Sequence, residues 1–188
     1  RPRLLPGRSL RCRPVRAVVV VPTYNEKENI QLFLAAVREA VPTADVLVVD
    51  DNSPDGTGAL AEQSAAELGQ VKVLHRPGKQ GLGSAYRHGF DVALAEGYDV
   101  IVSMDVDFSH DPTVIPSLLA AIDGGADAVI GSRYVPGGAT ADWPLHRRLP
   151  LHFLSTQAGR KADALITISE FSKQRLHQAL KFPVEMSP

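Results

Sequence analysis

An apolar run over residues 100–104 ends at two aspartates, Asp105 and Asp107, which are separated by a single residue. Continuous apolar runs of this kind are typical of strands that are buried on both faces of a parallel sheet. The two carboxylates are therefore predicted to lie at the carboxyl end of a buried strand. This edge is where open α/β sheets bind their ligands.

Two neighbouring carboxylates repel each other, and burying an unpaired charge is unfavourable. A hard divalent cation such as Mg²⁺ or Mn²⁺ would relieve the repulsion through oxygen ligands and would also bridge a diphosphate. Taken alone, an Asp-x-Asp pair more often belongs to an ordinary loop that carries two solvated acids. The choice between these interpretations depends on the rest of the chain.

Apolar runs alternate with helical patterns in steps of about 25 residues, which is the pattern of strands joined by crossover helices. Strands connected in this way form a mostly parallel, Rossmann-like α/β sheet with helices on both faces. The acidic clusters at 50–51 and 105–107 and the glycine-bearing loop at 76–83 each follow a predicted strand, so they are expected to meet at one edge. The predicted strands cover residues 17–21, 46–49, 71–74, 100–104 and 126–130, and the predicted helices begin near Lys27, Thr57, Ser84 and Asp111.

Length and composition limit the classes of protein that fit. With 188 residues, of which 44% are hydrophobic, the chain is expected to form one domain. A net charge of -1 gives no attraction to nucleic acid, and no run of about 18 apolar residues predicts a membrane span. The single cysteine, Cys12, excludes an internal disulfide and fits a reducing compartment. We expect a cytoplasmic protein.

Residues 1–16 contain six arginines, three prolines and no acid, and we predict a flexible basic arm. Such an arm is either a bare tail or a peripheral contact with anionic lipid on the cytoplasmic face of a membrane. Because the chain begins with Arg1 rather than methionine, we expect it to be processed, trimmed or partial.

Side chains that follow the first two predicted strands suit a nucleotide. The Asp51 carboxylate would accept hydrogen bonds from the N–H groups of uracil or guanine, although an Asx turn is an alternative. Pro22 and Tyr24 would form a wall against a base or ribose, and Glu26 would bond a hydroxyl. Simple loop packing is the alternative for Tyr24.

The loop of residues 79–83 offers backbone N–H groups and Lys79 beside a predicted helix N-terminus, which suits phosphate oxygens. The loop lacks the Walker pattern, and no Gly-x-Gly-x-x-Gly fingerprint follows the first strand. These absences argue against a P-loop ATPase and against an NAD enzyme.

Five ordered segments carry recognisable motifs, at residues 20–29, 49–57, 81–86, 104–110 and 131–138. They resemble the successive signatures of family 2 glycosyltransferases, and within that family most resemble polyprenol (dolichol) phosphate mannose synthases. The likeness extends over residues 17–149, where Trp143 and Arg147 match the family's Trp-x-x-x-Arg.

The resemblance implies a GT-A type fold and the inverting transfer of mannose from GDP-mannose to a polyprenyl (dolichyl) phosphate, with Mg²⁺ or Mn²⁺. It implies catalytic roles for Asp105, Asp107 and Arg133. It also implies a metal site at Asp105, Asp107 and Ser109, where many relatives have glutamine instead of Ser109. The donor contacts that it implies are Pro22, Tyr24, Glu26, Val49, Asp51, Asp105, Val106 and Arg133.

The chemistry of such a transfer fits the residue types. A phosphate monoester is anionic at neutral pH, so the acceptor needs a positive guide rather than a strong general base. Arg133, Arg147 and Arg148 are candidates for that guide, although the last two also fit an ordinary solvated basic pair. Two alternatives stay open: a family 2 transferase that uses a UDP-sugar, and a non-catalytic nucleotide-sugar-binding module.

The likeness to the mannose synthases stops after Leu149, so the C-terminal part is interpreted as truncated or replaced. Residues 162–173 resemble a piece of the family 4 transferases of GT-B fold, with a strand at 164–168 and a helix from Glu170 to Leu180. The predicted organisation is the arm at 1–16, a catalytic domain at 17–149 and an atypical segment at 150–188. The acceptor half of the site is then missing, so the chain would be a catalytic half that needs a partner for the rest, or inactive by itself. The expected partners are the nucleotide-sugar donor, the polyprenyl phosphate acceptor, and a membrane surface or a membrane protein.

Overall fold

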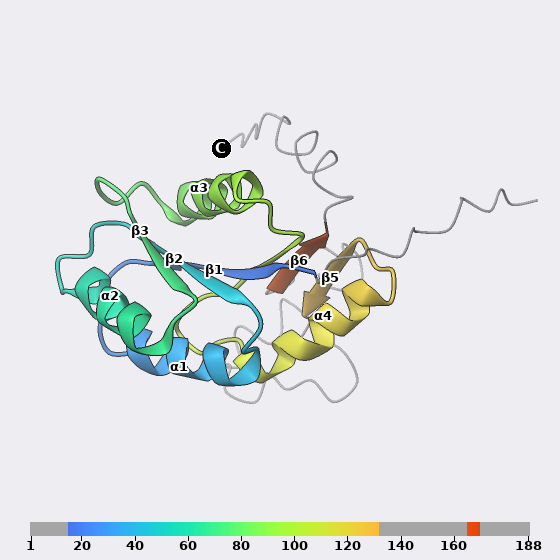
Figure 1. Cartoon of the computed structure of the whole chain (residues 1–188). Coiled ribbons are helices and arrows are strands. Elements are labelled where there is room, and N and C mark those ends of the chain that lie inside the picture. Colours follow the sequence, from blue (N-terminus) through green and yellow to red (C-terminus); the bar gives the residue numbers. More distant parts are fainter. Residues whose placement is uncertain (1–14, 132–164, 170–188) are drawn as a thin grey trace, which may run out of the picture.

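The computed structural model describes residues 15–131 and 165–169. They form one six-stranded sheet, in the order β3-β2-β1-β4-β6-β5, with helices packed against it (Figure 1). The strands are β1 (Ala17–Thr23), β2 (Asp45–Asp50), β3 (Val71–His75), β4 (Val100–Ser103), β5 (Ala128–Gly131) and β6 (Leu165–Ser169). The helices are α1 (Ile30–Ala40), α2 (Thr57–Leu68), α3 (Leu82–Ala95), the 3-10 turn η1 (Pro112–Val114) and α4 (Ile115–Asp123).

The strand β1 lies between β2 and β4 and pairs with both in parallel. All seven of its residues are buried, as its run of valines predicts. Pairing places Val20 opposite Leu47 of β2 and opposite Ser103 of β4. The carboxyl ends of these strands therefore lie at the same edge of the sheet.

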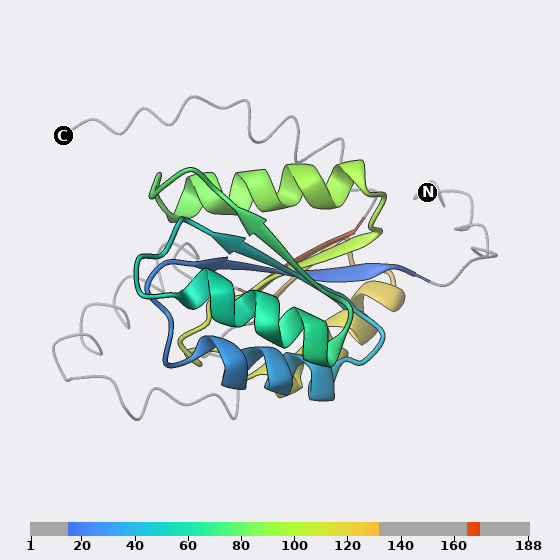
Figure 2. The same cartoon turned by 60° about the vertical axis from the view of Figure 1, so that its left-hand side comes forward.

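Alternate residues of β1 supply two separate cores. Val19 and Val21 pack with Phe33 of α1, whereas Val18 and Val20 pack with Ala85 of α3. Figure 2 shows the same division: α3 covers one face of the sheet, and α1, α2 and α4 cover the other. The prediction of helices on both faces is confirmed, because a strand exposes successive side chains to opposite faces.

The strand predicted at 164–168 is observed at 165–169, where it forms β6. It lies antiparallel between β4 and β5, so β5 joins the sheet through β6. The sequence gives no sign of this placement, since pairing between distant segments leaves no local pattern. The sheet is therefore parallel from β3 to β4 and antiparallel around β6.

Two helices begin later than their apolar patterns predict. The helix expected from Lys27 begins at Ile30, because the N–H groups of Asn29 and Ile30 first form a turn on the carbonyl of Glu26. After Asp111 the chain forms η1. The N–H of Thr113 in this turn donates to the Asp111 carboxylate at 2.9 Å. The α-helix α4 follows, with a proline in its first turn.

Arg16, which the sequence analysis assigns to the flexible arm, has fixed contacts. Its guanidinium lies 4.4 Å from the ring centroid of Tyr98 and donates to the carbonyl of Glu96 at 2.9 Å. The arm up to residue 14 and the helix predicted from Glu170 lie outside the described residues. Within the described part of the chain, no helix has both the length and the apolar character needed to cross a membrane.

Gly89 of α3 lies close against the strands of the sheet. A Cβ atom at this position would lie 2.5 Å from Cγ1 of Val20 and 3.0 Å from Cγ2 of Val49, and both valines are fully buried. We therefore expect Gly89→Ala to lower the free energy of unfolding by about 1–3 kcal/mol through overpacking. That loss should exceed the gain in helix propensity, which is at most about 1 kcal/mol.

Gly83, in the same helix, is the matched control, since a Cβ there meets no atom within 4 Å. Gly83→Ala should leave the free energy of unfolding unchanged or raise it by up to about 1 kcal/mol in urea denaturation. Equal stabilisation by both substitutions would mean that α3 does not sit this close to the sheet.

Candidate functional site

A hollow of about 270 Å³, which we call the rim pocket, opens at the carboxyl ends of β1, β2 and β4. It brings together the predicted side chains of Pro22, Tyr24, Glu26, Asp51, Asp105, Val106 and Asp107. This is the convergence that the parallel arrangement predicts. Its lining is Pro22, Thr23, Tyr24, Glu26, Asp51, Lys79, Gly81, Leu82, Ala85, Asp105, Val106 and Asp107.

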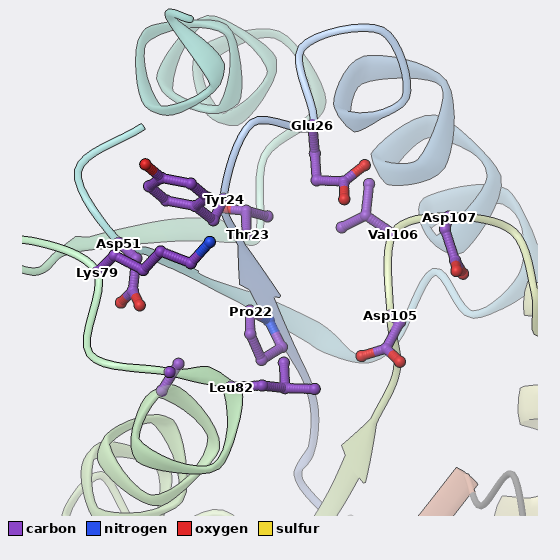
Figure 3. A pocket seen from close by; sticks show the side chains of 12 residues that line it. Pro22, Thr23, Tyr24, Glu26, Asp51, Lys79, Leu82, Asp105, Val106 and Asp107 are labelled. Atoms are coloured by element: carbon purple, nitrogen blue, oxygen red, sulfur yellow. The ribbon is translucent and has the colours of Figure 1, made fainter. Parts of the chain in front are cut away.

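The rim pocket has two chemically different ends, which Figure 3 shows on either side of Pro22. Asp51, Tyr24 and Lys79 gather at one end. Asp105 and Asp107 lie at the other end. An elongated ligand with a cation-binding group at one end and hydrogen-bond donors at the other fits this arrangement.

Asp51 is held by a buried ion pair. Its Oδ1 accepts from the guanidinium of Arg76 at 2.5 Å, and its Oδ2 accepts from the N–H of Gln80 at 3.1 Å. Both charged side chains are at most 5% exposed. Arg76 also donates to Gln80 Oε1 and to Ser84 Oγ, so its orientation is fixed as well. The orientation of the carboxylate is therefore set without a ligand.

The preceding residue, Asp50, has a structural role. Its Oδ1 accepts from the hydroxyls of Thr23 and Ser53, and its Oδ2 accepts from the Ser53 N–H at 3.1 Å. These bonds join the ends of β1 and β2 and form the turn after β2. Of two adjacent aspartates in the sequence, one braces the loop and the other lines the rim pocket.

The loop that follows β1 is fastened to the loop that follows β2. The N–H groups of Asn25, Glu26 and Lys27 donate to Ser53 Oγ, Thr57 Oγ1 and Asp55 Oδ2, at 2.9–3.1 Å. Burial raises the pKa of Asp55, but the hydrogen bonds from Thr57 and Lys27 together outweigh it and leave the pKa below its ordinary value. Tyr24 and Glu26 are thus presented on a braced segment.

Lys79 lies at the same end of the rim pocket as Tyr24 and Asp51. Its Nζ lies 4.0 Å from the ring centroid of Tyr24, in a cation–π contact. The lysine is exposed, and Gly81 and Leu82 beside it begin α3 and line the same pocket. A mobile cation beside a helix N-terminus is suited to the oxygens of a phosphate group.

The segment 105–107 divides its side chains between the core and the rim pocket. Val106 is 2% exposed and belongs to the core beneath α1, while the carboxylates on either side of it face the rim pocket. The Asp107 carboxylate accepts from the N–H of Ser109 at 2.9 Å, which closes a tight turn. Phe108 within that turn has φ of 55° and packs its ring against Phe33 at 5.6 Å.

Asp105 is held from α3. The hydroxyl of Tyr86 donates to Asp105 Oδ1 at 2.7 Å. Burial of the phenol raises the pKa of Tyr86 above its ordinary value, and the hydrogen bond to Asp105 raises it further. Tyr86 therefore remains a protonated donor at physiological pH.

Two predicted site residues do not line the rim pocket, and a third is not among the described residues. Val49 is fully buried beneath α3 and is not part of the lining of the rim pocket. Ser109 is exposed, and its hydroxyl lies 3.2 Å from Nδ1 of His110 rather than in that lining. Arg133 falls outside the described residues, as do Trp143, Arg147 and Arg148.

The two aspartates fit a divalent cation that shares its coordination with a ligand. Within residues 15–131 and 165–169, no three acidic, histidine or cysteine side chains are gathered into a ready-made metal site. Mg²⁺ usually binds through one or two carboxylates together with substrate phosphates and water. Asp105 and Asp107 supply such hard oxygen atoms on one side of the rim pocket.

Sequence reasoning missed two residues that hold the site together. The sequence analysis assigns no role to Arg76, and it includes Tyr86 only as the last residue of the segment 81–86 that resembles the family. The available signal for Arg76 is its position directly after β3, which pairs with β2, the strand that Asp51 follows. For Tyr86 there is no local signal, because its partner lies 19 residues away on another element.

Comparison with known proteins identifies relatives of this arrangement. Residues 18–181 match glycosyl transferase family 2. Polyprenol monophosphomannose synthase of Mycolicibacterium smegmatis is 54% identical over 133 residues, which cover 70% of this chain and 50% of that protein. Undecaprenyl-phosphate mannosyltransferase of Micrococcus luteus is 54% identical over 135 residues, which cover 72% of this chain and 55% of that protein. The chain spans about half the length of these curated relatives.

A solved structure shares the fold. Glucosyl-3-phosphoglycerate synthase from Mycobacterium tuberculosis, in complex with Mn²⁺, UDP and glucosyl-3-phosphoglycerate, matches with a TM-score of 0.55. The match covers 82% of this chain and 57% of that chain at 21% identity, which supports a shared fold only. The predicted α/β fold of GT-A type is confirmed. With a family match that runs from β1 through β6, the chain belongs to glycosyl transferase family 2.

Proposed function

We propose that this chain is the donor-binding catalytic domain of an inverting, metal-dependent mannosyltransferase, which moves mannose from GDP-mannose to a polyprenyl phosphate. The observation that carries the proposal is the rim pocket, with an oriented Asp51 at one end and the Asp105–Asp107 pair at the other. The names of the two relatives, both 54% identical, support mannose as the sugar and a polyprenyl phosphate as the acceptor.

The donor would lie along the rim pocket with its base at Asp51. The Asp51 carboxylate would accept from the N–H groups of guanine, while the ring packs against Tyr24 and Pro22. Lys79 would leave the face of Tyr24 and contact a phosphate oxygen. The diphosphate would then reach Asp105 at the far end.

The transfer itself is a displacement at the anomeric carbon of mannose. An oxygen of the acceptor phosphate attacks C1, and the bond from C1 to the diphosphate oxygen breaks, so that GDP leaves and the configuration inverts. A divalent cation, Mg²⁺ or Mn²⁺, would neutralise charge on the leaving diphosphate. Asp105 and Asp107 would hold that cation, and Arg133 would bind phosphate oxygens. Ser109 would reach the cation through water, and Val106 would border the donor, whereas Val49 lies buried behind the pocket.

A polyprenyl phosphate is anchored in a lipid bilayer by its apolar tail, so the transfer would take place at a membrane surface. We propose peripheral contact with that surface or with a membrane-protein partner. The basic residues of segment 1–14 would favour anionic lipid.

Donor identity is tested by ligand-induced stabilisation. GDP-mannose with Mn²⁺ should raise the melting temperature of the chain more than UDP-glucose does, because only a bound ligand shifts the folding equilibrium. Since Asp51 and Arg76 would also suit uracil, a larger shift with UDP-sugars would instead establish a UDP-sugar transferase. A transfer assay with radiolabelled donor and a short polyprenyl phosphate then measures turnover. Binding without any transfer would identify a non-catalytic module.

Asp107→Asn should abolish the charge that the cation needs while keeping the size of the side chain. We expect transfer to fall by at least about 100-fold, because the cation stabilises the leaving group by several kcal/mol. Asp123→Asn, on the exposed end of α4, is the control and should keep full activity. Full transfer by Asp107→Asn would remove Asp107 from the metal site.

Lys79→Met should weaken the binding of GDP by about tenfold and leave the binding of guanosine nearly unchanged, because the lost contact is to a phosphate. The difference between wild type and variant should shrink as salt increases. Lys72→Met is the control, since Lys72 pairs with Glu96 outside the rim pocket. Calorimetric titration of each variant with both ligands measures the effect, and equal losses for GDP and guanosine would contradict it.

A further inference from the structure

We propose that Tyr86 is a positioning residue that sets the orientation of Asp105 toward the cation and the donor diphosphate. This inference rests on the proposed function and adds to it a residue that touches neither the sugar nor the cation. Tyr86 acts through a single hydrogen bond, from its hydroxyl to Asp105 Oδ1 at 2.7 Å.

The hydrogen bond engages only one of the two oxygens of the Asp105 carboxylate. Oδ1 is engaged by the phenol, which leaves Oδ2 for a ligand on the side of the rim pocket, where Figure 3 places the carboxylate. A carboxylate that binds a metal is commonly hydrogen-bonded in turn, and the second bond fixes its direction. Tyr86 supplies that bond from outside the lining of the pocket.

Tyr86 is itself held rigidly. Its ring is half-buried and lies 5.7 Å from the ring of Phe90, one helical turn further along α3. Gly89, on the same side of the helix, lets α3 approach Val20 and Val49 more closely than any larger residue would. The phenol therefore reaches Asp105 from a helix whose distance to the sheet is fixed by packing.

The same helix forms part of the pocket wall. Leu82 and Ala85, at the N-terminal end of α3, line the rim pocket, and Tyr86 directly follows Ala85. A shift of α3 on donor binding would therefore move the hydrogen-bond donor of Asp105 as well. In this proposal α3 both lines the part of the pocket that would hold the diphosphate and orients the Asp105 carboxylate.

The two aspartates are held in different ways. Asp107 is exposed, and the N–H of Ser109 in its own turn donates to it at 2.9 Å. Asp105 is half-buried, and its hydrogen bond comes from another element of the fold. Removing the Tyr86 hydroxyl should therefore release Asp105 and leave the turn around Asp107 intact.

Tyr86→Phe removes the hydroxyl and keeps the ring on Phe90. We expect the affinity for Mn²⁺ in the presence of GDP, followed by electron paramagnetic resonance of free Mn²⁺, to fall by about tenfold or more. The affinity for GDP without metal should stay at the wild-type value, which a general loss of structure would not allow. In the transfer assay the KM for Mn²⁺ should rise by a similar factor.

Tyr98→Phe is the matched control. The Tyr98 hydroxyl also donates to a carboxylate, Asp45 at 2.5 Å, but Asp45 begins β2 and so lies at the opposite edge of the sheet. Its loss should leave the affinity for Mn²⁺ unchanged. A second comparison uses the double variant. Adding Tyr86→Phe to Asp105→Asn should not lower the affinity for Mn²⁺ any further, because the phenol acts through that carboxylate.

The outcomes separate this inference from the proposed function. If the wild-type chain binds neither GDP nor Mn²⁺ with GDP, the proposed function fails. If the wild-type chain binds both and Tyr86→Phe binds Mn²⁺ equally well, the proposed function stands and the role of Tyr86 is wrong. An equal loss in Tyr98→Phe, or an additive loss in the double variant, would likewise overturn the role of Tyr86.

Discussion

The parallel pairing of β1 with β2 and β4 is the constraint on which the rest of the structure depends. Because the three strands run in one direction, the loops that follow them meet at one edge of the sheet. Asp51 and Asp105 are far apart in the sequence, and this pairing places both in the lining of the rim pocket. A reversed central strand would carry its loop to the opposite edge and leave no site.

Most of the framework could be predicted from the sequence. The valine-rich run of β1 and the apolar run of β4 are buried strands, and the aspartates at 51, 105 and 107 follow strand ends as expected. These features are local, since hydrophobic periodicity and a change to polar residues are visible within a few positions. The same signals place helix starts less well, and α1 begins three residues late because Glu26 first closes a turn.

The features that the sequence does not reveal are contacts between distant segments. The buried ion pair of Arg76 with Asp51 depends on the place of β3 in the sheet. The hydrogen bond from Tyr86 to Asp105 depends on how α3 packs against the sheet. Asp50 and Asp51 are adjacent, chemically identical and both buried, so only their hydrogen-bond partners from distant segments give them different roles. Here charge and hydrogen-bond geometry complete a site whose location the apolar pattern had already determined.

The position of β6 has a consequence for the order in which the protein assembles during synthesis. β6 is made last among the described strands, yet it fills an interior place between β4 and β5. Until residue 169 has been translated, β4 has an unpaired edge and β5 has no partner strand in the nascent chain. An unpaired edge is a template for pairing with other chains. A ribosome that stalls before this point would release a sheet prone to association.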